Sequence, residues 1–165
     1  MSGSGSVAYM SGTSVSQLVW VSRQGVEQPI TDTDRDYVFP RLEPPEGRRV
    51  LVSASGNLWI KDTAGNKAFT VQNTQTTTGN SYPVWTLDAK RVVYRTGTGL
   101  YAMDVDSGRP QLIPGTSAND FPSSVSRNGD TPDFRPGYGG LVRRCLGALA
   151  ARRAQAACAG EHGGL

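Results

Sequence analysis

The residue types that most often carry catalysis or bind metals are scarce in this chain, and their spacing predicts no active site. The 165 residues include one histidine, His162, and two cysteines, Cys145 and Cys158. His162 stands among glycines near the end of the sequence, whereas a catalytic or metal-binding histidine needs a rigid element and oriented partners. The two cysteines have no second ligand pair, so their spacing does not match a zinc site.

One acidic segment has the alternation of a metal-binding loop. Asp32, Asp34 and Asp36 alternate in TDTDRDY, but the Gly and Glu of a helix-loop-helix calcium site are missing. We therefore expect a solvated connection here rather than an ion site. Asp62 and Asp104 recur at the ends of two related segments, and recurrence of this kind indicates a turn rather than a catalytic pair.

The motifs of the common nucleophilic and phosphoryl-transfer enzymes are also missing. The sequence has no G-x-S-x-G elbow, no H-R-D and no D-F-G. We therefore predict a protein that is not an enzyme, with no catalytic, cofactor-binding or metal-binding residues and no cofactor.

A repeat of about forty residues is the main signal in the sequence. Residues 18–25, 58–65 and 100–107 are alternating apolar runs that end in a polar turn, and Pro40, Pro83 and Pro122 are spaced by 43 and 39 residues. A fixed period of this length indicates a solenoid, a propeller or an array.

The spacing of the apolar residues within the repeat favours strands. Val50, Val52, Leu58 and Ile60 recur at a spacing of two among β-forming residues, and Gly and Asn stand where hairpin turns are needed. A helical repeat would need a spacing of three and four instead of two. We predict four short strands in each of two units, at 38–42, 49–53, 57–62 and 67–71, and at 82–86, 91–95, 99–104 and 110–113. Four antiparallel strands in each unit predict an all-β protein and match a β-propeller blade.

The ends of the repeat region predict incomplete units. Residues 7–30 supply a second, third and fourth strand without a first, and a further unit begins at 121–125 and stops after its first strand. The prediction is an incomplete propeller of about two and a half blades, whereas closed propellers have about 4–8. Unpaired blades expose sheet edges, so either copies of the chain associate through these edges into a ring or the chain is a fragment of a longer protein.

Three pieces of sequence carry a family resemblance: YPVWTLDAKRVVY, FPRLEPPEGRRVLV and FPSSVSRNGD. They resemble the TolB-like and WD-like propeller repeat, in which Pro-x-Trp-Ser-Pro-Asp-Gly-Lys precedes an apolar strand. Together with LVWVSRQGVEQPI, they look like the propeller regions behind bacterial serine/threonine kinase domains. The resemblance implies that Trp85 packs between blades. Ala89 takes the place of the turn glycine and should strain that turn slightly.

The resemblance implies a non-catalytic interaction module, a scaffold or sensor that binds a protein or peptide. The alternative is an accessory propeller fragment of a larger enzyme, such as a bacterial serine/threonine kinase or a prolyl-oligopeptidase-type peptidase.

The region 131–165 differs in composition from the repeat region 1–130. It is rich in Ala, Arg and Gly, and the repeat pattern stops abruptly at its start. One interpretation is an amphipathic helix over 141–159, for a membrane surface or a partner. The interpretation we favour is a frame-shifted segment that is poorly ordered or weakly packed, because the change falls inside a repeat.

Charge and hydropathy limit the classes of partner. Residues 1–130 contain 12 Lys and Arg and 12 Asp and Glu, so the net charge of +3 comes from the tail. A neutral repeat region does not favour nucleic acid, and we expect its aromatic residues to be core residues rather than stacking platforms: Trp20, Trp59, Trp85, Tyr94 and Tyr101. No run approaches the ~18 apolar residues of a membrane span. No secretory signal begins the sequence, so we expect a cytoplasmic location for the chain as it stands.

Overall fold

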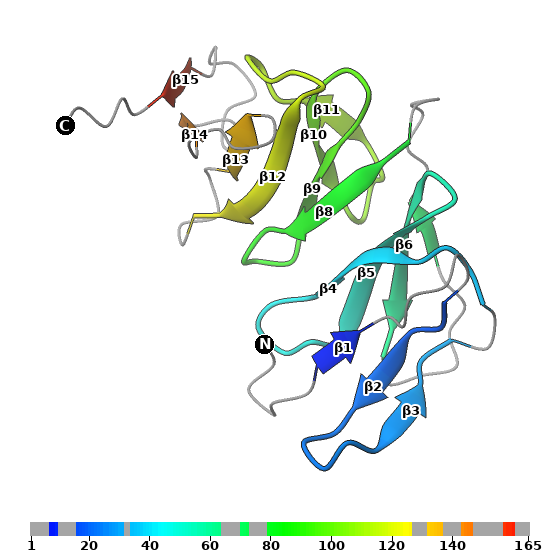
Figure 1. The fold of residues 1–165 in the computed structure, drawn as a ribbon. Helices are drawn as coiled ribbons and strands as arrows, with labels where there is room; N and C mark the ends of the chain where they lie inside the picture. The colour runs from blue at the N-terminus through cyan, green and yellow to red at the C-terminus, as the bar shows by residue number, and fades with distance from the viewer. Residues whose placement is uncertain are drawn as a thin grey trace.

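The computed structural model describes residues 7–9, 16–31, 34–63, 70–72, 79–126, 132–136, 143–146 and 157–160. These residues form antiparallel sheets that follow one another along the chain (Figure 1). Each sheet is a meander in which consecutive strands pair, so that sheet order equals chain order. The short turns contain the Gly, Asn and Asp residues that tight hairpins require.

The first sheet has three described strands and the second has four. The first contains β1 (Val7–Tyr9), β2 (Val19–Val21) and β3 (Glu27–Pro29), and the second contains β4 (Val38–Leu42), β5 (Arg49–Ala54), β6 (Asn57–Asp62) and β7 (Thr70–Gln72). The three described strands of the first sheet lie within residues 7–30, where three strands were predicted.

The third and fourth sheets each have four described strands. The third contains β8 (Ser81–Trp85), β9 (Arg91–Arg95), β10 (Leu100–Asp104) and β11 (Pro110–Leu112), and the fourth contains β12 (Asp120–Val125), β13 (Pro132–Pro136), β14 (Arg143–Leu146) and β15 (Ala157–Gly160). The strands predicted for the two central units agree with these bounds to within a few residues, except that residues 67–69 of one predicted strand lie outside the described residues.

The fourth sheet corrects two expectations about the end of the chain. The unit that begins near residue 121 does not stop after its first strand, because β13 pairs with β12, β14 with β13, and β15 with β14. The helix considered over 141–159 is wrong for 143–146 and 157–160, which are strands. The composition of β14 and β15 gives no strand signal. Their pairing, which continues the sheet from β13, supplies hydrogen-bond partners for their backbone N–H and C=O groups.

The expectation of weak packing in the tail is wrong for β13. Phe134 has no exposed surface and lies in a cluster with Val84, Val93, Leu100 and Ile113 of the third sheet and the segment that follows it. Burial of a phenylalanine side chain contributes roughly 1.5–3 kcal/mol. The prediction for most of the remaining tail falls outside the described residues, and the frame-shift origin of this segment stays a prediction.

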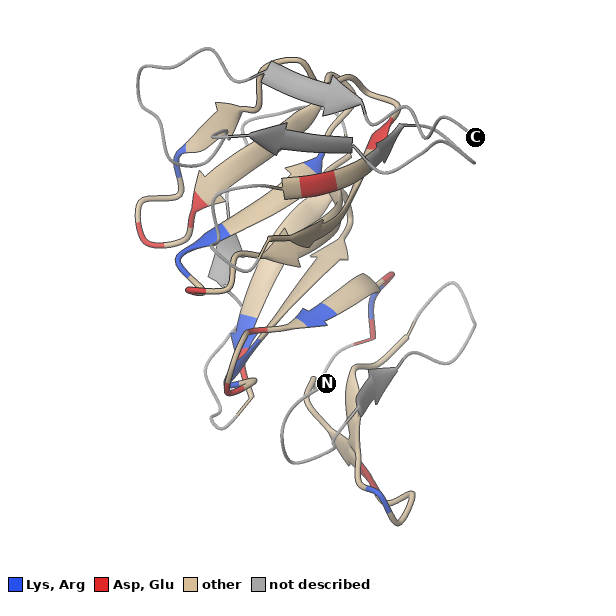
Figure 2. Cartoon of the chain, turned by 90° about the vertical axis from the view of Figure 1, so that its left-hand side faces the viewer, with Lys and Arg blue, Asp and Glu red and all other residues tan. Residues whose placement is uncertain are grey.

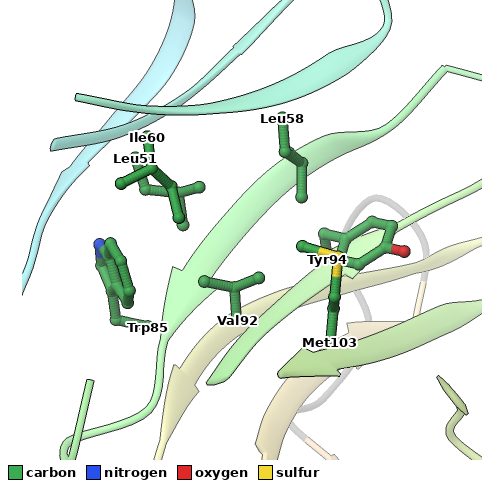
Figure 3. Close-up of a cluster of buried hydrophobic side chains, with 7 residues drawn as sticks. All are labelled: Leu51, Leu58, Ile60, Trp85, Val92, Tyr94 and Met103. Atoms are coloured by element: carbon green, nitrogen blue, oxygen red, sulfur yellow. The ribbon is translucent and has the colours of Figure 1, made fainter. Parts of the chain in front are cut away.

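The core lies between successive sheets, and β8 contributes to two of its layers. Val84 packs toward the fourth sheet and Trp85 toward the second, as alternation along a strand requires. Figure 3 shows the layer around Trp85, in which Leu51, Leu58 and Ile60 of the second sheet face side chains of the third. Trp85 therefore packs between neighbouring sheets, as the family resemblance implied.

Candidate functional site

Apart from Cys145 and Cys158, which are partners in the pairing of two strands, the described sequence-based candidates for chemistry do not come together in one place. His162 and Asp32 lie outside the described residues. Cys145 and Cys158 lie on β14 and β15, and Asp34 and Asp36 lie in the connection that precedes β4. The part of the chain that the structure describes holds no group of three His, Cys, Asp or Glu side chains able to bind a metal ion.

Asp36 has a structural role in the described geometry. Its carboxylate accepts hydrogen bonds from the Ser55 backbone N–H at 3.0 and 3.1 Å and from the Ser55 hydroxyl at 3.0 Å. Ser55 is in the β5–β6 turn with a φ of 49°, a conformation that costs energy for a residue with a Cβ. Asp36 therefore stabilises a hairpin turn of the sheet that follows it.

Asp104 stabilises the turn after β10. Its Oδ1 accepts backbone hydrogen bonds from Ser107 at 2.9 Å and Asp106 at 3.1 Å. The hydrogen bond from Ser107 is the main reason that the pKa of Asp104 lies below its ordinary value. The recurrence of Asp at this strand end was predicted to reflect turn structure, and Asp104 confirms it. Asp62 occupies the matching end of β6.

The aromatic residues singled out from the sequence are mostly packing residues. Trp85 and Tyr94 are buried between the second and third sheets, and Trp20, Trp59 and Tyr101 are half-buried against the core clusters or neighbouring rings. The Trp59 and Trp85 indoles each donate a hydrogen bond to a backbone carbonyl, of Ala54 and Arg41 respectively. Their positions support the core interpretation over a base-stacking platform.

A second set of aromatic residues, which the sequence analysis missed, is the candidate site. Phe39, Tyr82 and Phe121 lie on β4, β8 and β12, the first strands of three successive sheets. The rings of Phe39 and Tyr82 are stacked with centroids 4.0 Å apart, and the ring of Phe121 meets Tyr82 edge-on at 4.9 Å. We call these three residues the aromatic ladder. All three side chains are half-buried, so each keeps some exposed surface.

The first strands bring the ladder together because they are where successive sheets approach each other. β8 contacts both β4 and β12, and Figure 1 shows β8 and β12 side by side. Each ladder residue stands directly before a proline, Pro40, Pro83 or Pro122. The recurring aromatic-proline pair was a signal that could have identified the ladder from the sequence.

Two of the three ladder residues have an unusual backbone. Phe39 has a φ of 56° and Tyr82 a φ of 52°. The pairing register shifts within both strands, between Val38 and Arg41 and between Ser81 and Val84, so each ring stands at a β-bulge. Bulky residues rarely adopt a positive φ, which costs about 1–3 kcal/mol. The repeat thus places a strained backbone at the same position of two sheets.

Arg95 lies over the ring at the Phe121 end of the aromatic ladder. The guanidinium carbon of Arg95 lies 4.7 Å from the centroid of the Phe121 ring, and Arg95 Nε donates to the Ala118 carbonyl at 2.7 Å. A cation held over a ring is attracted by the electrons of the ring face. In the view of Figure 2, segments coloured as Lys and Arg are interspersed with segments coloured as Asp and Glu along the described chain.

Solved structures of two larger proteins are similar to this chain. TolB from Acinetobacter baumannii aligns over 86% of this chain and 41% of its own, with a TM-score of 0.64 and 15% identity. The β-propeller domain of Cps50 (Swd1) from Myceliophteria thermophila aligns over 80% of this chain and 47% of its own, with a TM-score of 0.60 and 11% identity. The chain therefore spans less than half the length of either structure.

These similarities define the class of protein by its fold. No family model matches the chain, and no curated protein matches it. Four-stranded meanders packed face to face, together with the two structural neighbours, show an all-β chain with a partial β-propeller fold of the TolB-like and WD-like kind. Within the described ranges, no helix has the length and apolar character needed to cross a membrane.

Proposed function

We propose that this chain is a non-catalytic β-propeller interaction module that binds a protein or peptide partner at the aromatic ladder. The observation that supports the proposal is the contact of Phe39, Tyr82 and Phe121 across three successive sheets. Rigid aromatic side chains supply large contact areas at low cost in conformational entropy, and they are enriched among the residues that dominate binding energy.

The strained backbone of the ladder supports a binding role. Phe39 and Tyr82 both have a backbone φ in the left-handed region, which is rare for bulky residues. Strain of this kind persists where the surrounding structure enforces it, and it is concentrated at functional sites. The ladder is therefore prearranged, and a partner would not have to offset the cost of ordering it.

The roles of the described carboxylates support a non-catalytic module. Asp36 and Asp104 accept hydrogen bonds in turns, and the buried Asp120 accepts them from the N–H and hydroxyl of Ser117 at 2.7 and 3.1 Å. Asp88 does the same for Thr86 at 2.6 Å and Lys90 at 3.1 Å. Burial acts to raise the pKa of Asp88, but these hydrogen bonds and the nearby cations outweigh it and the pKa is lowered. Such groups are committed to structure rather than poised for proton transfer.

A selection from a phage-displayed random peptide library tests the proposal. Peptides selected on the wild-type chain are titrated against Tyr82→Asn, which removes a ladder ring while Asn tolerates a positive φ. The control is Leu112→Asn, which changes an exposed strand residue of the same sheet outside the ladder. We expect a loss of affinity of at least about tenfold, or about 1.4 kcal/mol, in Tyr82→Asn alone.

Two results would contradict this proposal. One is selected peptides that bind wild-type and Tyr82→Asn chains with equal affinity while both remain folded by circular dichroism. The other is a selection that yields no peptide with measurable affinity. The alternative function, an accessory propeller of a larger enzyme, stays a prediction, because no observation on the described residues favours it.

A further inference from the structure

The register of the outermost hairpin in the fourth sheet places the two cysteines of the chain opposite each other. In the pairing of β14 with β15, Cys145 is the direct partner of Cys158. Directly opposed residues of an antiparallel pair have Cα atoms about 4.5 or 5.5 Å apart. Disulfide bonds need Cα atoms about 4.4–6.8 Å apart, so this register satisfies the backbone requirement for a bond.

We propose that Cys145 and Cys158 form a reversible disulfide that fastens β15 to the fourth sheet. β15 is the last strand in that sheet, and its one described partner strand is β14. A covalent bond across this pair would fix the register and hold an edge strand that backbone hydrogen bonds alone hold weakly. The proposal rests on the register of these two strands and not on the aromatic ladder.

The reaction needs a disulfide of low molecular weight as the oxidant, and glutathione disulfide is of this class. One cysteine thiolate attacks the glutathione disulfide, forms a mixed disulfide and releases one reduced glutathione. The second thiolate attacks the protein sulfur of the mixed disulfide and releases the second reduced glutathione. The protein loses two protons and two electrons, and the oxidant gains them. Arg143 and Arg144 precede Cys145 in the sequence, and their positive charge attracts an anionic oxidant of this kind.

Oxidation of the intact chain with glutathione disulfide, followed by trypsin digestion and mass spectrometry, tests the proposal. Trypsin cleaves after Arg144, Arg152 and Arg153, so an intrachain disulfide links the peptides 145–152 and 154–165. We expect this linked pair as the main oxidised product of the wild-type chain, and its loss after treatment with dithiothreitol.

A variant with one cysteine moved by a single position shows whether the disulfide forms because of the strand register or because the two cysteines are close in sequence. In the double variant Cys145→Ser with Leu146→Cys, the cysteine moves to the other face of β14, because side chains alternate along a strand. We expect the yield of linked peptides to fall by roughly tenfold in this variant under native conditions. In urea the two chains should give equal yields, since an unfolded chain has no register. Equal yields under native conditions, or glutathione bound separately to each cysteine of the wild-type chain, would overturn the proposal.

Discussion

The guanidinium of Arg49 on β5 lies over the indole ring of Trp85 on β8, with its central carbon 5.0 Å from the ring centroid. Nε and Nη2 of the same guanidinium both donate to Oε1 of Glu43, at 2.9 and 2.5 Å, and Nη2 also donates to the Ala89 carbonyl at 3.1 Å. The Arg49 side chain thus connects the second sheet to β8 and to the β8–β9 turn of the third sheet.

Replacement of Arg49 should weaken the packing of these two sheets. In Arg49→Met the Glu43 carboxylate, which has only 14% of its side chain exposed, loses its partner. We expect the free energy of unfolding in urea to fall by about 1–3 kcal/mol. Arg48→Met is the matched control, because Arg48 and its partner Glu46 are 75% and 58% exposed, and exposed pairs contribute about 0–1 kcal/mol. Equal losses in the two variants would contradict the bridging role of Arg49.

Replacement of Ala89 by glycine should stabilise the β8–β9 turn. Ala89 has a φ of 56°, which is unfavourable for a residue with a Cβ, and the family resemblance predicted strain at this position. We expect Ala89→Gly to raise the free energy of unfolding by about 0.5–1 kcal/mol. The reciprocal change, Gly47→Ala at the matching turn where φ is 69°, should lower it by about 1–2 kcal/mol. Thermal melts of both variants check the pair, and a melting temperature that falls in Ala89→Gly would contradict the assigned strain.

Removal of the Tyr94 hydroxyl should not destabilise the chain. Tyr94 is fully buried, and its hydroxyl has no hydrogen-bond partner among the residues that the structure describes. An unsatisfied buried hydroxyl lowers stability, so we expect Tyr94→Phe to raise the free energy of unfolding by up to about 1 kcal/mol. Tyr101→Phe, in which a hydroxyl near Thr98 on the exposed side is removed, should change it by less than about 0.5 kcal/mol. A clear loss of stability in Tyr94→Phe, measured in urea, would show that the hydroxyl is satisfied.

Tyr94 also predicts that the unfolding free energies of wild type and Tyr94→Phe depend differently on pH in the alkaline range. Burial, with a contribution from Tyr101, raises the pKa of Tyr94 above its ordinary value of 10.0. The folded chain then holds this proton more tightly than the unfolded chain, so the related stability is present below pH 10 and is lost as the pH rises above it. We expect the unfolding free energy of wild type to fall more between about pH 9 and about pH 11 than that of Tyr94→Phe. Parallel pH profiles would contradict this linkage.

The strands of the two central sheets could be predicted because their signal is local. Apolar residues spaced by two, such as Val50 and Val52 on one face of the second sheet and Leu58 and Ile60 on the other, indicate strands without reference to the rest of the chain. The strain at the Ala89 turn and the packing of Trp85 followed from the family resemblance. In these sheets the local preference of each segment agrees with the final fold.

The fourth sheet and the ladder could not be derived in the same way because both depend on contacts between distant segments. β13 to β15 have a composition that gives no strand signal, and the pairing of β13 with β12 and the burial of Phe134 determine their structure. The ladder residues are 43 and 39 positions apart, so their contact follows only when three sheets pack in order. The aromatic-proline repeat was visible in the sequence, but the stacking of the rings was not.

The contact between the ladder rings is the most direct test of this account, because both the sheet order and the proposed binding site depend on it. Nuclear Overhauser effects between aromatic ring protons can be measured on a chain with labelled Phe and Tyr. The account predicts cross-peaks between Phe39 and Tyr82, whose centroids are 4.0 Å apart, and between Tyr82 and Phe121, at 4.9 Å. A spectrum that shows the contact between the Tyr94 and Tyr101 rings of the third sheet, whose centroids are 6.1 Å apart, but neither pair of ladder cross-peaks would contradict it.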